Sequence, residues 1–98
     1  MAYVPTNPGL FVVLGQINTP AIDQAIKTHF PNESYALQPG QWLISAPGKT
    51  TKEISDQLGI SAEPFIGSAI IISVGNYFGV AAPQIWEWIA AKAGALRV

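Results

Sequence analysis

Positions 48–51 read GKTT and come nearest to a known chemical motif in this chain. The phosphate-binding loop G-x-x-x-x-G-K-[ST] finishes with a lysine and a hydroxyl residue just before a helix. Its backbone N–H groups bind an anion. The first glycine of that pattern would stand at position 43, which is Leu43. We therefore predict a helix cap with a weak nucleic-acid or anion contact at Lys49, Thr50 and Lys52, and no nucleotide site.

The longer segment 50–61 reads TTKEISDQLGIS. It resembles the first helix and turn of bacterial helix-turn-helix regulators, which implies a nucleic-acid-binding regulator. The resemblance ends at Ser61, because Pro64, Gly67 and a β-branched run follow where a recognition helix needs Arg, Lys, Asn or Gln facing the bases. The caps of a short helix explain the same residues, so nucleic-acid binding stays an alternative.

Acid–base and metal chemistry have few candidates. His29 is the only histidine, and the chain has no cysteine, so a His/Cys metal site or a thiolate nucleophile is not available. The carboxylates are isolated along the chain: Asp23, Glu33, Glu53, Asp56, Glu63 and Glu87. We predict no catalytic residue, no metal and no cofactor, and we favour a protein that is not an enzyme.

An aromatic cluster precedes and enters the C-terminal segment. We interpret its members as protein-interaction residues, because amphipathic aromatic side chains are enriched in interfaces: Asn76, Tyr77, Phe78, Trp86 and Trp88. Trp86 and Trp88 lie about 200° apart on a helix, so we expect one of them to face solvent, a partner or a ligand. Core packing of the last helix is the structural alternative.

Trp42, Asn76 and Tyr77 support a further alternative. If they met on an open face of the sheet, they would orient a ligand in an apolar pocket. The protein would then be a cofactor-free enzyme acting on a small molecule.

Composition favours a partner over a nucleic acid. Charged residues make up 11% of the 98 residues, against about 25% in an average domain, while 49% are apolar. A surface with so few charges is expected to bury apolar area against a second copy or another protein. The net charge of −1 leaves nucleic acid possible but unsupported.

Nothing in the sequence predicts export or a membrane span. The absence of cysteine suits a reducing compartment, and the first residues lack the basic region of a signal peptide. No apolar run approaches the ~18 residues that a span requires. We expect a cytoplasmic protein with no membrane contact.

The pattern of apolar and breaker residues predicts seven elements. Strands are expected at 10–14, 34–38, 41–46 and 68–74, and helices at 20–30, 51–58 and 83–93. Thr19 is the expected N-cap of the first helix, with Asp23 in its first turn. Thr50 and Glu53 form a capping box, and Gly59 is the expected left-handed terminator.

This order, β-α-β-β-α-β-α, predicts a single α+β domain over residues 1–98. It matches the ferredoxin-like split βαβ sandwich with an extra C-terminal helix. The run 68–74 (SAIIISV) has the composition of a strand covered on both faces, although this topology places it at an edge. Either the last helix or a second subunit must cover it. Our leading hypothesis is a non-enzymatic interaction module that uses this strand and the aromatic C-terminal helix.

Overall fold

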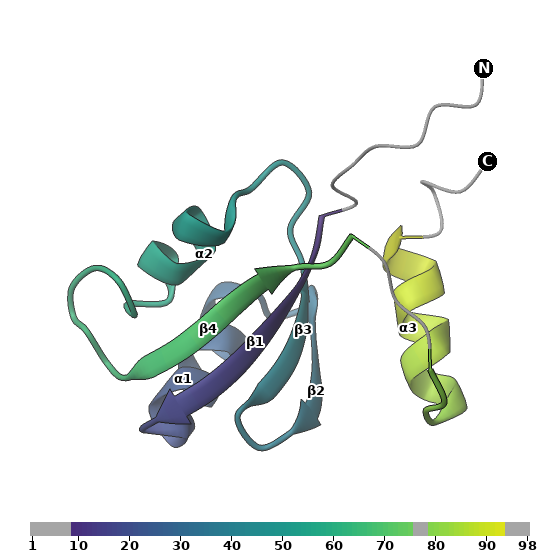
Figure 1. Cartoon of the computed structure of the whole chain (residues 1–98), viewed down its shortest axis with the longest axis horizontal. Helices are drawn as coiled ribbons and strands as arrows, with labels where there is room; N and C mark the ends of the chain where they lie inside the picture. The colour runs from purple at the N-terminus through teal and green to yellow at the C-terminus, as the bar shows by residue number, and fades with distance from the viewer. Residues whose placement is uncertain (1–8, 76–78, 94–98) are drawn as a thin grey trace.

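The computed structural model describes residues 9–75 and 79–93. Its elements are β1 (Leu10–Ile17), α1 (Thr19–His29), β2 (Ser34–Gln38), β3 (Gln41–Ser45), α2 (Thr51–Gln57), β4 (Ser68–Ser73) and α3 (Pro83–Ala93). The strands form one antiparallel sheet in the order β2-β3-β1-β4. Helices α1 and α2 lie on one side of it and α3 on the other (Figure 1).

The predicted α+β class is therefore confirmed, as a four-stranded antiparallel sheet with three helices. The arrangement is not a clean βαββαβ sandwich. Helix α3 packs against the sheet face that such a sandwich leaves open, and the pairing of β1 with β4 is irregular between Gly15 and Ile17.

Strand β1 lies between β3 and β4, and it is longer than the strand predicted at 10–14. The expected end of this strand at position 14 is wrong, because Gly15 continues the sheet on both sides. Its N–H donates to the Gly40 carbonyl at 2.7 Å, and it lies opposite Ala69 of β4. The strand ends only at Ile17.

The main core lies between the sheet and the pair α1 and α2. Its fully buried side chains come from β1, α1, β3, α2 and the C-cap of α2: Phe11, Val13, Ile22, Ile26, Ile44, Ile54 and Leu58. The apolar residues Ile22 and Ile26 of α1 and its C-cap residue Phe30 recur at helical spacing, and all three are buried. Apolar burial at this spacing is what holds a short amphipathic helix on a sheet.

The predicted start of α1 is wrong by one residue. The N-cap is Asn18, in the left-handed region at φ 57, and its side chain makes no cap bond. Its amide Nδ2 donates instead to the Ile66 carbonyl at 2.8 Å. Asp23 falls beyond the first turn, where its Oδ1 accepts bonds from Gly40 N–H and from the Trp42 indole.

Local signals around the hairpin and α2 are confirmed. Gly40 lies in the break expected between the strands at 34–38 and 41–46, and its φ of 81 is a value that glycine adopts readily. Thr50 and Glu53 form the capping box. Gly59 has φ 80, and Ile60 N–H donates to the Ser55 carbonyl at 3.0 Å, as in a Schellman terminus.

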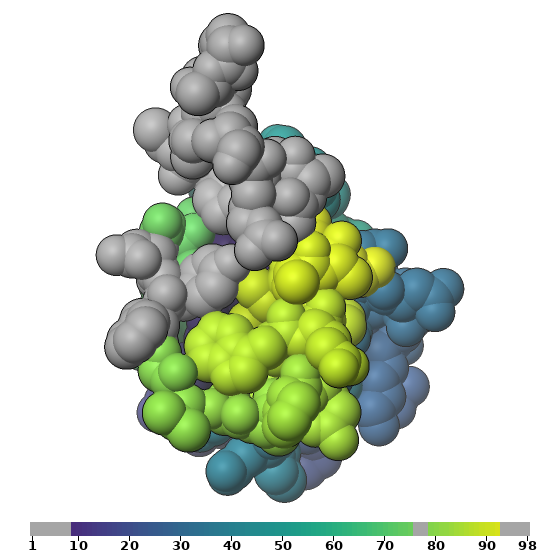
Figure 2. Space-filling view, turned by 90° about the vertical axis from the view of Figure 1, so that its right-hand side faces the viewer, coloured from purple at the N-terminus to yellow at the C-terminus, as the bar shows by residue number. Residues whose placement is uncertain are grey.

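Helix α3 covers the second face of the sheet (Figure 2). Ile89 is buried against Leu10 and Leu43, and the Trp88 ring lies 5.8 Å from the ring of Tyr35. The expectation that one tryptophan faces away is wrong, since Trp86 and Trp88 are both partly buried in this cluster. The direction of Ile89 lies between theirs on the helix, so both large rings reach the sheet from the flanks.

Candidate functional site

The outer edge of β4 is the most distinctive exposed feature of the described chain. Strand β4 pairs with β1 on one side, and it is the last strand of the sheet on the other. Within this chain β4 is not covered on both faces: Ile70 is 53% exposed and Ile72 is 45% exposed, so the last helix does not supply the expected cover for them. Helix α3 lies over the centre of the sheet, where its cluster includes Val12 and Val74 but neither of these isoleucines.

The hydrogen-bond phase of β4 shows which backbone groups point outward. Val74 N–H donates to the Leu10 carbonyl at 2.8 Å, and in the same register Ile72 lies opposite Val12 and Ile70 opposite Leu14. In an antiparallel pair, alternate residues direct both backbone groups to the same neighbour. The remaining residues, Ala69, Ile71 and Ser73, therefore direct their N–H and C=O groups to the outer edge.

This edge lacks two of the usual protections against pairing, which are charged residues and proline. Natural edge strands are commonly interrupted by charges, proline or a covering segment. Residues Ser68–Ser73 (SAIIIS) contain no charge and no proline. On the face that carries Ile70 and Ile72, the exposed side chains of β4 are apolar or serine. The edge is therefore physically able to accept another strand.

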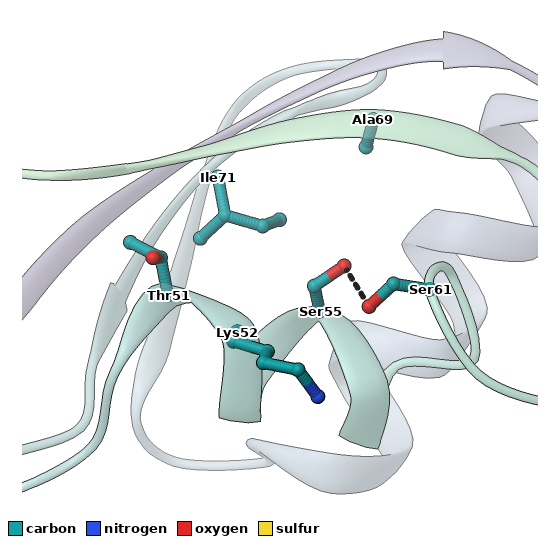
Figure 3. A pocket seen from close by; sticks show the side chains of 6 residues that line it. All are labelled: Thr51, Lys52, Ser55, Ser61, Ala69 and Ile71. Carbon is teal, nitrogen blue, oxygen red and sulfur yellow. Dashed lines mark hydrogen bonds between the residues drawn. The ribbon is translucent and has the colours of Figure 1, made fainter.

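A groove lies on the opposite face, between α2 and β4 (Figure 3). Its volume is about 230 Å³, and it is lined by Thr51, Lys52, Ser55, Ser61, Ala69 and Ile71. The two residues of β4 form an apolar side, and Ser55 and Ser61, joined by a 2.8 Å hydrogen bond, form a polar one. Sequence reasoning missed Ser55, Ser61, Ala69 and Ile71, because only the fold brings α2 against β4.

An ion pair stands at the rim of this groove. Lys52 Nζ lies 2.7 Å from Asp56 Oδ2, and the Ser61 hydroxyl donates to Asp56 Oδ1. The hydrogen bond from Lys52, followed by the one from Ser61, holds the pKa of the Asp56 carboxyl below its ordinary 3.8. The bond to Asp56 and its charge raise the pKa of Lys52 above 10.5.

The pH dependence of this pair follows from the two directions. The lowered Asp56 pKa contributes stability that is complete above pH 3.8 and is lost as pH falls through the lowered value. The raised Lys52 pKa contributes stability that is complete below pH 10.5 and is lost as pH rises through the raised value. The pair is therefore intact at neutral pH.

We expect Lys52→Met to raise the pKa of Asp56 toward its ordinary value, since the largest cause of its lowering is removed. An NMR titration of the Asp56 side-chain carboxyl carbon measures this shift. Lys49→Met is the matched control, because the Lys49 amine donates to Gln57 Oε1 and not to Asp56. An Asp56 pKa that is the same in wild type and Lys52→Met contradicts the assignment.

The residues predicted for an anion or nucleic-acid contact bind within the chain. Lys49 donates to Gln57 at 3.2 Å, Thr50 exchanges capping bonds with Glu53, and Lys52 pairs with Asp56. The segment after α2 is a loop followed by β4, so no second helix follows as in a helix-turn-helix unit. The structure does not bring the three residues together around a common site.

Trp42 does not lie on an open sheet face. It is 6% exposed, its side chain is in the core beneath α1, and its indole Nε1 donates to Asp23 Oδ1 at 2.6 Å. Asn76 and Tyr77, its predicted companions in a ligand pocket, lie outside the described residues, as does Phe78 of the predicted interaction set. The pocket hypothesis therefore loses Trp42 as a lining residue.

Among residues 9–75 and 79–93, no group of three or more His, Asp or Glu side chains is placed to hold a metal ion. In the same part of the chain, no helix has both the length and the apolar character to cross a membrane. Comparison of the sequence with protein-family models, curated proteins and solved structures finds no match.

Proposed function

We propose that this protein is a non-enzymatic interaction module that binds a protein strand along the outer edge of β4. The observation that carries the proposal is the combination of outward-directed backbone groups on Ala69, Ile71 and Ser73 with exposed Ile70 and Ile72. In strand addition, main-chain hydrogen bonds provide affinity and alternate side chains provide specificity. Strand β4 offers both.

The aromatic C-terminal helix has a narrower role in this proposal than β4. Trp86 and Trp88 pack on the sheet next to Ile89, and Lys92 Nζ lies 3.0 Å from Glu33 Oε1. These contacts attach α3 to the domain and cover the centre of the sheet face on which α3 lies. A partner would therefore contact the part of that face that α3 leaves uncovered, along Ile70 and Ile72.

Several polar groups that would serve catalysis have structural partners instead. Asp23 binds the Trp42 indole, Glu53 caps α2, and Asp56 pairs with Lys52. A binding role requires none of these groups to be free, which supports an interaction module over an enzyme.

Two finer assignments belong with this proposal. The strand order β2-β3-β1-β4, with α1 and α2 on one face, supports a ferredoxin-like split βαβ frame to which α3 is added. A cytoplasmic location is supported by a sequence without cysteine.

The test places a charge on the edge. We expect Ile72→Lys to weaken self-association and partner capture by roughly tenfold or more, because burying an isoleucine contributes about 1.5–3 kcal/mol. Sedimentation velocity on the purified chain measures self-association, and quantitative affinity capture from an extract of the native cell measures other partners.

Val80→Lys is the matched control for this experiment. It makes the same kind of change at a fully exposed residue in the segment that leads into α3, away from β4 (Figure 1). Equal binding by wild type and Ile72→Lys would contradict the proposal. So would a wild-type chain that sediments as a monomer and captures no partner.

A further inference from the structure

We infer that the strand added to β4 is β4 of a second copy of this chain, paired antiparallel about a two-fold axis at Ile71. The inference rests on the proposed function and names its partner. It makes one continuous sheet from the two four-stranded sheets. A two-fold interface uses the same surface on both subunits, so β4 must be complementary to itself.

The alternating direction of the backbone N–H and C=O groups along β4 selects this register. Outward-directed residues must face outward-directed residues, and those of β4 are Ala69, Ile71 and Ser73. With the axis at Ile71, Ile71 faces the partner's Ile71, and Ala69 faces the partner's Ser73. All outward groups of the strand then form hydrogen-bonded pairs, in which opposite residues exchange both N–H···O bonds. An axis at Ile70 or Ile72 leaves part of them unpaired.

The side chains fit the same register. Ile70 lies opposite the partner's Ile72, in a pair without direct hydrogen bonds, where side chains approach most closely. The isoleucines that are 53% and 45% exposed in one copy would then cover each other across the axis. On the other face, the Ile71 side chains meet beside the groove between α2 and β4 (Figure 3).

Charge favours a second copy as the occupant. Two identical charged strands repel each other when paired, and like charges placed opposite each other are destabilising. Residues Ser68–Ser73 carry no charge, so self-pairing meets no such repulsion. The sequence SAIIIS also places a small residue opposite a small one and isoleucine opposite isoleucine in this register. An interface of this size lies at the small end of the range, so we expect a reversible dimer.

Cysteine cross-linking tests the register, because the natural chain has no cysteine. Ile70→Cys and Ile72→Cys are purified separately, and each alone and their equimolar mixture are exposed to mild oxidant. Opposite residues in this kind of pair have Cα atoms about 4.5 Å apart, within the range of a disulfide. Identical positions lie on the diagonal, about 7–8 Å apart, which is too far.

We expect the mixture to form a disulfide dimer about tenfold faster than either variant alone, as read on non-reducing gels and by intact mass. Faster cross-linking of Ile70→Cys alone would place the axis at Ile70 and overturn the register. No cross-linking in any sample would overturn self-pairing.

A second variant tests the backbone bonds without introducing thiols. Ser73→Pro removes an outward N–H from an exposed position, and proline is tolerated where an edge strand faces outward. We expect it to weaken dimerisation by about tenfold in sedimentation, with an unchanged circular dichroism spectrum. Dimerisation equal to that of wild type would overturn the inference.

The failure of this inference is distinguishable from the failure of the proposed function. If the wild type is a monomer but Ile72→Lys still loses a captured protein, the edge binds a different chain and only the second copy is excluded. If neither self-association nor capture depends on Ile72, both proposals fail.

Discussion

Phe11→Ala is expected to lower the free energy of unfolding by about 3–5 kcal/mol. Phe11 is fully buried in β1, opposite Ile44 of β3 on one side and Ser73 of β4 on the other. Its ring packs in the cluster that also contains Ile26 of α1 and Ile54 of α2. Alanine leaves a cavity where these elements meet, and close-packed surroundings relax only partly around it.

Urea unfolding followed by circular dichroism measures this loss. Because a domain of this kind has only about 5–15 kcal/mol of stability in total, the variant is expected to be close to unfolding. Val80→Ala is the control, and its fully exposed side chain predicts a change within about 0.5 kcal/mol. A loss below about 1 kcal/mol for Phe11→Ala would contradict the placement of this ring in the main core.

Gly67→Ala is expected to destabilise the fold by about 1–3 kcal/mol through a clash with backbone. A Cβ atom at Gly67 would stand close to the Ile17 carbonyl oxygen, within 3.3 Å of Asn18 Cβ, and within 3.3 Å of Ile22 Cδ1. The carbonyl belongs to the end of β1, so relief requires β1 or the start of β4 to move. The substitution therefore tests how the candidate edge is positioned.

Gly75→Ala provides a matched control for the same chemical change. A Cβ at Gly75 has no heavy atom within 4 Å, so alanine is accommodated there. We expect its stability to equal or slightly exceed that of wild type, because alanine restricts the unfolded chain. Thermal unfolding of the two variants side by side measures the difference, and equal stabilities would contradict the close approach at Gly67.

Features that depend on neighbouring residues were predictable from sequence. The capping box of Thr50 and Glu53, the left-handed Gly59 and the break between β2 and β3 all formed where the sequence predicts them. The bounds of α3, Pro83–Ala93, also agree with the prediction. Each of these features is decided within a few residues, where sterics and local hydrogen bonds select the conformation.

Features that depend on distant partners were not predictable. The Asn18 side chain makes no capping bond, because its amide donates to the Ile66 carbonyl, which is 48 positions away in sequence. Asp23 leaves its expected role at the helix start because Gly40 and Trp42 approach its carboxylate. No local pattern in the sequence marks these contacts.

By itself, the sequence determined the class of the fold and the order of its helices and strands. The spacing of apolar residues and the positions of proline and glycine select each element within a short stretch of chain. The sequence also showed that β4 is apolar and without charge. Only the tertiary structure decided which side of β4 is covered. An apolar run predicts burial but does not name the element that buries it, and α3 packs over β1 and β3 instead of over Ile70 and Ile72. The exposed edge that carries both proposals is the result of that packing.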